Sequence, residues 1–160
     1  MIDIYYKQGD IFKIGLQTAD AMCVSGSGMS FSLGLNNVKL ENELSPYELI
    51  IVEKNKYFYS VPEKHLDEDS YKKHILDFLF KANKLNLKKI ILNASKDIKP
   101  QETPAEWSWR ELDDKRSKFM VSTVKEWIEK NNNSLLQITF ISMDDSFTRV
   151  FPKEKEIYNS

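Results

Sequence analysis

The chain has 160 residues, of which 29% are charged, and its formal net charge is −1. A nearly neutral chain has no overall electrostatic attraction for nucleic acid or an anionic membrane, although a local basic patch is compatible with it. This excludes the strongly basic classes of binding protein. We expect one domain over residues 1–160, because this length is usual for a single compact core.

The single cysteine, Cys23, excludes an intramolecular disulfide and favours a reducing compartment. No apolar run approaches the ~18 residues of a membrane span, and the first residues lack the apolar core of a signal peptide. The two histidines have no cysteine at zinc-binding spacing. We therefore expect a cytoplasmic protein that has no membrane contact, metal ion or cofactor.

Short apolar runs and two amphipathic segments follow one another along the chain. Strands are expected at 2–7, 19–24, 48–53, 56–61, 88–94 and 135–143, and the turn at Lys54-Asn55 predicts a hairpin of the third and fourth. Helices are expected at 69–85, where apolar residues recur at three- and four-residue steps, and at about 109–130. This order is typical of an α/β layered domain with a mixed sheet.

The segment CVSGSGMSFSLG, residues 23–34, runs from a buried strand into small residues and holds three of the five glycines in the chain. Glycine lets backbone amides converge on an anion, and a helix beginning near Phe31 would add free N–H groups. Ligands of open α/β sheets bind beyond the carboxyl ends of strands, where this segment begins. The alternative is a strand-to-helix turn that needs glycine for its own geometry, since the segment lacks the lysine of a Walker loop.

Two segments resemble the macrodomain family, whose members bind ADP-ribose and some of which remove it from proteins or nucleic acids. Gln8-Gly9-Asp10-Ile11 matches the G-D-[IL] element after the family's first strand, and Asp20-Ala21-Met22-Cys23-Val24-Ser25 matches its acidic residue, buried strand and loop start. The resemblance implies a macro-like three-layer α/β/α domain with a central mixed sheet. It also implies that Asp10 accepts a hydrogen bond from the adenine amino group.

The resemblance implies ADP-ribose, or a related adenine nucleotide, as the ligand, with an ADP-ribosylated protein or nucleic acid as its carrier. The expected contacts lie at the ends of the first two strands. The predicted ligand-binding residues are Asp10, Ile11, Ser25, Gly26, Ser27, Gly28, Met29, Ser30 and Phe31. The backbone amides from Ser25 to Phe31 are expected to bind the phosphates.

Within the family, the chain is most similar to the branch of terminal ADP-ribose glycohydrolases, through segments 56–61, 69–71 and 89–92. That branch uses a lysine after the fourth strand and an aspartate in the loop after the next strand. Lys64 and Asp97 are therefore the expected catalytic residues. A deprotonated lysine would attack the anomeric carbon of the distal ribose, and the acidic residue would help to resolve the covalent adduct.

The chain departs from the family pattern at several positions. Val24 and Ser27 stand where common macrodomains have the asparagines of their N-A-A-N motif, and the G-G-G-V run is absent. Strict alignment places Glu63 rather than Lys64 at the lysine position, and residues 94–100 replace the glycine-rich second loop. The alternative function is therefore a degenerate macro-like domain that binds a protein partner and no nucleotide.

Two further groups of residues are candidate contacts. Trp107 and Trp109, in the segment PQETPAEWSWR, are unfavourable in water, so we expect one in the core and the other at the domain edge, unless they contact a ligand or a protein partner. The lysines at 81, 84, 88 and 89 would bind nucleic acid only if they shared one face. Their mixed helix and strand positions argue against this.

Overall fold

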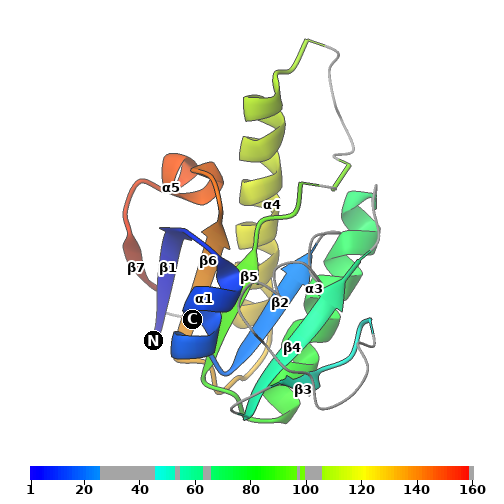
Figure 1. Ribbon diagram of the computed structural model, residues 1–160, viewed down its shortest axis with the longest axis vertical. Coiled ribbons are helices and arrows are strands. Elements are labelled where there is room, and N and C mark those ends of the chain that lie inside the picture. Colours follow the sequence, from blue (N-terminus) through cyan, green and yellow to red (C-terminus); the bar gives the residue numbers. More distant parts are fainter. Residues whose placement is uncertain (26–45, 53–54, 63–65, 97, 100–105, 159–160) are drawn as a thin grey trace.

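A computed structural model of the protein describes residues 1–25, 46–52, 55–62, 66–96, 98–99 and 106–158, and shows one sheet with helices on both faces (Figure 1). The strands are β1 (Ile2–Gln8), β2 (Ala21–Ser25), β3 (Ile50–Val52), β4 (Lys56–Val61), β5 (Lys89–Asn93), β6 (Gln137–Ser142) and β7 (Lys155–Tyr158). Their order is β3-β4-β2-β5-β6-β1-β7. The strands from β4 to β1 run parallel, whereas β3 and β7 pair antiparallel at the edges. The sheet is therefore mixed, with a parallel centre.

Helix α1 (Ile11–Thr18) covers one face of the sheet. The Phe12 ring of α1 meets the Phe58 ring of β4 edge to face, with 6.0 Å between the ring centroids. Gly15 permits a close approach, because a Cβ at this position would lie 2.7 Å from Sδ of the buried Met22. The helix therefore packs directly on the sheet.

The opposite face is covered by α3 (Glu68–Lys84), α4 (Trp109–Lys130) and α5 (Ser146–Val150) (Figure 1). Phe78 of α3, Trp127 of α4 and Phe147 of α5 belong to one buried cluster with Phe140 of β6. A second, smaller cluster fills the space between the sheet and α1. The two clusters make three layers, α/β/α, as the family resemblance implies.

The sequence-based helices and hairpin are confirmed, and three elements within the described ranges are additional. α4 has the expected bounds, α3 begins and ends one residue earlier than 69–85, and β3 pairs antiparallel with β4. The additional elements are α1, α5 and β7. An isolated helix as short as α1 is marginal in water, so it depends on contacts with the sheet that its local sequence does not reveal.

Cys23 lies in β2 and is 1% exposed, so the thiol is part of the core as expected. Burial raises the pKa of this thiol. Its sulfur is therefore a poor nucleophile at neutral pH. None of the helices in the described ranges has an apolar stretch long enough to span a membrane.

The close approach of α1 to the sheet predicts that Gly15→Ala is destabilising. Overpacking of a core costs about 1–3 kcal/mol, and the better helix propensity of alanine offsets about 1 kcal/mol, so we expect a net loss of about 1 kcal/mol. Urea denaturation measures this loss. In a Met22→Ala background, which removes the clashing Sδ, the same substitution should be neutral or stabilising. An equal loss in both backgrounds would contradict the packing.

Candidate functional site

The parallel strands end at one edge of the sheet, called here the carboxyl edge. Gln8 at the end of β1 is opposite Ser142 of β6, and Asn93 of β5 is opposite Ile141, so these strand ends lie level. In Figure 1 the arrowheads of β2, β4 and β6 point to this edge, and α4 begins beyond it. The segments that carry the sequence-predicted site residues all leave the sheet here.

Asp10 is the N-cap residue of α1. Its Oδ1 accepts hydrogen bonds from the backbone N–H of Phe12 at 2.8 Å and of Lys13 at 3.4 Å. The turn between β1 and α1 is tight and requires glycine at position 9, because a Cβ there would lie 2.9 Å from Cδ1 of Ile14. The carboxylate is therefore held at the carboxyl edge, directly after β1.

Ser25, the last residue of β2, is held by two side chains. Asn93 Oδ1 accepts a hydrogen bond from the Ser25 N–H at 2.8 Å, and Asn93 Nδ2 donates to the Ser25 carbonyl at 3.2 Å. The Ser25 hydroxyl lies 2.7 Å from the hydroxyl of Tyr71 in α3. Because the Ser25 N–H is already bonded to Asn93, this amide is not available to a phosphate in this conformation. These bonds therefore fix the position of Ser25, after which the chain leaves β2.

Lys96 joins three elements at the carboxyl edge. Its Nζ lies 2.8 Å from Oδ2 of Asp113 in α4 and 2.8 Å from Oδ2 of Asp144, which follows β6. Asp144 also accepts hydrogen bonds from the Ser142 hydroxyl at 2.7 Å and the Ser146 backbone N–H at 3.0 Å. Burial opposes ionisation of Asp144, but these donors outweigh it and hold the pKa of the carboxyl group well below its usual value. The network ties the chain after β5 to α4 and β6.

The remaining predicted site residues are only partly described. Ile11 is 7% exposed and packs in the cluster under α1, so its side chain is part of the core. Gly26, Ser27, Gly28, Met29, Ser30, Phe31, Glu63, Lys64 and Asp97 lie outside the described residues. The neighbours of Asp97 are held at the carboxyl edge, since Lys96 joins the network above and the Ile98 carbonyl accepts a hydrogen bond from Arg116 Nε at 2.8 Å.

Asn93, Lys96 and Tyr71 are absent from the sequence-based set of site residues. The only local signal is at Asn93, a polar residue that ends the otherwise apolar strand KIILN. Ser25 and Asn93 are 68 positions apart in the chain. Only the parallel pairing of β2 and β5 brings them together.

The two tryptophans before and at the start of α4 do not enter the core, which corrects the sequence-based expectation. Trp109 is 78% exposed and Trp107 is half-buried. The Ser108 hydroxyl accepts a hydrogen bond from the Glu111 N–H in a capping box, which places Trp109 in the first turn of α4, beyond the sheet (Figure 1). Trp127, 8% exposed, is the tryptophan that packs in the core.

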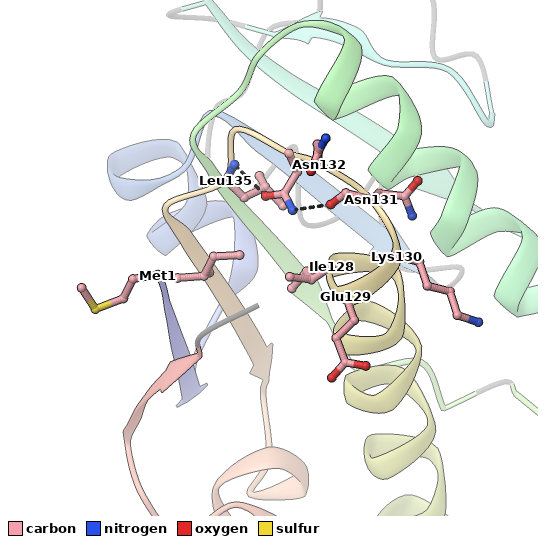
Figure 2. Close-up of a pocket in the computed structure, with 9 residues that line it drawn as sticks. Met1, Ile128, Glu129, Lys130, Asn131, Asn132 and Leu135 are labelled. Carbon is pink, nitrogen blue, oxygen red and sulfur yellow. Dashed lines mark hydrogen bonds between the residues drawn. The ribbon is translucent and has the colours of Figure 1, made fainter.

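A hollow of about 480 Å³ lies away from this edge, between the start of β1 and the end of α4 (Figure 2). Its asparagines are bonded locally, since Asn133 donates to the Asn131 carbonyl at 3.1 Å and accepts from the Leu135 N–H at 3.0 Å. Across the described ranges, no group of three His, Cys, Asp or Glu side chains is placed to hold a metal ion. The carboxyl edge, where the sequence-predicted residues gather, is therefore the candidate nucleotide site.

The Lys96 network predicts a pH-dependent loss of stability in Asp144→Asn. At neutral pH we expect a loss of about 1 kcal/mol, below the value of a buried charge-assisted bond because 51% of the side chain is exposed. The depressed pKa means that wild type holds this contribution above pH ~4 and loses it as the pH falls further. Urea denaturation from pH 7 down to pH ~2.5 should therefore show the two proteins converging.

Glu154→Gln is the matched control for Asp144→Asn, because Glu154 is exposed and its carboxylate has no ion-pair partner among the described residues. This variant should match wild type in stability at neutral pH. A loss in Asp144→Asn that stays constant across the acid range would contradict the ionised, hydrogen-bonded carboxylate.

Several solved structures are similar in fold to this chain. The macrodomain of Trypanosoma brucei, solved with ADP and with ADP-ribose, has TM-scores of 0.60 and 0.59 at 11% identity, over 92% of this chain and 67% of that one. The macro domain of ganglioside induced differentiation associated protein 2 has a TM-score of 0.60 at 11% identity, over 93% and 82%. A tomato leucine aminopeptidase mutant has a TM-score of 0.52 at 9% identity, over 94% of this chain and 35% of that one.

No family model matches the sequence, and no curated protein matches it with significance. At sequence identities this low, structural similarity shows that the folds are alike but does not show that the activities are alike. The mixed seven-stranded sheet flanked by helices matches the macrodomain structures. The chain therefore has the macrodomain fold.

Proposed function

We propose that the protein binds ADP-ribose or a related adenine nucleotide at the carboxyl edge of its sheet. The observation that carries the proposal is the macrodomain fold, because the Trypanosoma brucei macrodomain was solved with ADP and with ADP-ribose. The G-D-[IL] element at Gly9-Asp10-Ile11 supports the proposal, since it leaves the sheet at this edge.

The spacing of the proposed contacts suits an elongated ligand. β1, which precedes Asp10, and β2, which ends at Ser25, are separated in the sheet by β6 and β5. Three strand steps of ~4.8 Å make about 14 Å. In this proposal Asp10 accepts a hydrogen bond from the adenine amino group, and the backbone amides of 26–31 bind the phosphates.

Asp10 has two tasks in this proposal, and its chemistry permits both. The N–H groups of Phe12 and Lys13 both bond to Oδ1, and each oxygen of an ionised carboxylate can accept more than one hydrogen bond. The cap also fixes the direction of the carboxylate before a ligand arrives. Binding therefore needs little reorganisation of this side chain.

Ser25 acts in the proposal as an anchor and not as a phosphate contact. Its N–H and carbonyl are bonded to Asn93, and its hydroxyl lies against Tyr71. These bonds fix the point at which the chain leaves β2. The phosphate contacts are accordingly assigned to Gly26 and the residues that follow it.

Removal of ADP-ribose from a modified macromolecule is the enzymatic extension of the proposal, with Lys64 as nucleophile and Asp97 as the acidic residue. The competing function is a protein-interaction module that binds no nucleotide. One observation favours that alternative: Trp109 is 78% exposed at the start of α4. A large exposed indole is typical of an interaction surface.

Titration calorimetry with ADP-ribose and AMP tests the proposal, and Asp10→Ser tests the role of the carboxylate. Serine keeps the N-cap of α1 but removes the charge. We expect wild type to bind ADP-ribose more tightly than AMP. We expect Asp10→Ser to lose about 1.5–3 kcal/mol of binding free energy for both, which is roughly a 10- to 150-fold weaker affinity.

Asp67→Ser is the matched control, because Asp67 caps α3 through the Ser70 N–H, after β4 and at the far side of the parallel strands from β1. It should leave AMP binding unchanged. Equal affinities for AMP in wild type and Asp10→Ser would remove Asp10 from adenine recognition. No heat at millimolar ADP-ribose would overturn nucleotide binding and favour the interaction module.

Lys64→Ala tests the enzymatic extension. If Lys64 is the nucleophile, the variant should release no ADP-ribose from an ADP-ribosylated protein, whereas calorimetry should still detect binding of free ADP-ribose. Lys73→Ala, an exposed lysine of α3, is the control and should retain the activity. A Lys64→Ala variant with wild-type turnover would exclude this lysine from the mechanism.

A further inference from the structure

Four lysines surround a hollow of about 640 Å³ at the edge of the sheet where the parallel strands begin. Lys56 starts β4 and Lys88 and Lys89 lie at the start of β5, whereas Lys7 lies near the end of β1, opposite Ile141 of β6. We call this feature the lysine hollow. Three of its lysines lie at the opposite end of the strands from the carboxyl edge, so most of the hollow is separate from the proposed nucleotide site, and Lys7 lies on the side nearer to that site.

The lysine hollow lies beside the end of α1. Gln17 and Thr18, at the end of this helix, line it together with Tyr5 of β1 and Gln137 of β6. The apolar side chains of α1 pack on the sheet in the cluster that contains Met22, Phe58 and Ile91. The sheet side chains that line the hollow are mostly polar, and Tyr5, Lys7 and Gln137 are half-buried.

The charges of the hollow are not neutralised by the surrounding protein. Asp20 is the one acidic residue that lines it, and its Oδ2 accepts hydrogen bonds from the backbone N–H groups of Lys88 at 3.1 Å and Lys89 at 3.0 Å. Within the described part of the chain, no carboxylate lies within ion-pair distance of the four lysine ammonium groups. The site therefore combines four positive side chains with one negative side chain that is bonded to backbone.

The grouping differs from the one that the sequence suggested. Lys81 and Lys84 lie on α3, and Lys81 is paired with Asp77 at 2.9 Å. They do not share a face with Lys88 and Lys89. The sheet instead places Lys88 and Lys89 around the same hollow as Lys7 and Lys56, which are far away in the sequence.

The row of lysines is longer than a single phosphate. β4 and β1 are four strand steps apart, since β2, β5 and β6 lie between them. At ~4.8 Å per step the lysines extend about 19 Å across the sheet, and Lys7 is also displaced along β1, since Asp3 is the residue of β1 that is level with Lys89. Several negative charges on one flexible chain match such a row, as in the sugar–phosphate backbone of a nucleic acid strand.

We propose that the lysine hollow binds the backbone of single-stranded nucleic acid. The lysines neutralise successive phosphates, and Gln17, Thr18 and Gln137 supply neutral hydrogen-bond donors for phosphate and sugar oxygens. Tyr5, whose ring has Lys7 Nζ at 5.3 Å, and the exposed Leu136 supply apolar surface for bases. These contacts do not distinguish one base from another, so binding is expected to be independent of base sequence. Because the lysines bind phosphates, binding is also expected to weaken as the salt concentration rises.

Fluorescence anisotropy with a labelled oligo(dT) of about twelve nucleotides tests the proposal. Wild-type affinity should fall steeply between about 50 and 200 mM KCl. The variant Lys56→Gln with Lys89→Gln should bind at least about tenfold more weakly at the lower salt. Its log–log salt slope should be smaller by about 1.4, because two phosphate contacts of about 0.7 each are lost.

Lys73→Gln with Lys118→Gln is the matched control, because both lysines are exposed on the helices of the opposite face and the charge change is the same. It should bind oligo(dT) within about twofold of wild type. Thermal melting checks that each variant is folded, and Lys7→Gln with Lys88→Gln replaces the first pair if that pair does not fold. An equal loss in the control would overturn the hollow as the site.

Three further results would also overturn the proposal. The first is absence of oligo(dT) binding at low salt. The second is binding of phosphatidylserine vesicles or polyglutamate where oligo(dT) does not bind, which would assign the hollow to another anion. The third is displacement of oligo(dT) by excess ADP-ribose, which would place the strand at the carboxyl edge. Calorimetry with ADP-ribose alone tests the proposed nucleotide site independently. Failure of the nucleotide proposal can therefore be distinguished from failure of the nucleic acid proposal.

Discussion

Parallel strands stop at a common edge, where the sheet no longer pairs their backbone groups and side chains must complete the hydrogen bonding. Asp10 accepts from the first turn of α1, Asn93 bonds both backbone groups of Ser25, and Asp144 accepts from the Ser146 N–H. Each of these side chains fixes the start of the segment that leaves the sheet. These few bonds hold Asp10 and Ser25, two of the described candidate contacts, at the carboxyl edge.

The two ends of the sheet have opposite chemistry although both are built from the same strands. At the carboxyl edge, carboxylates are bonded to lysine or to helix N–H groups, as for Asp144 with Lys96. At the other end, the Asp20 carboxylate is bonded to backbone N–H groups and the lysine ammonium groups around it are left to solvent. A nearly neutral chain can therefore present a local cationic surface, because net charge says nothing of where charges gather.

The macrodomain fold supports the position proposed for the candidate site but does not determine the chemistry of that site. The same fold is found in the Trypanosoma brucei macrodomain, solved with ADP-ribose, and over 35% of a tomato leucine aminopeptidase. The proposed nucleotide binding therefore depends on the segments that leave the carboxyl edge. In this chain those segments carry Lys64, Asp97 and the glycines after Ser25, on a framework that holds Asp10 and Lys96 in place.

The sequence by itself determined the long helices, the hairpin and the α/β class, because amphipathic periodicity, strand alternation and turn residues are local signals. It also proposed Asp10 as a candidate contact, because this residue follows the first strand in a recognisable motif. The short α1, the bond between Ser25 and Asn93, the exposure of Trp109 and the grouping of Lys7 with Lys56 were decided only by the tertiary structure. Each of these depends on which strands become neighbours, and parallel pairing joins residues whose distance along the chain leaves no local trace.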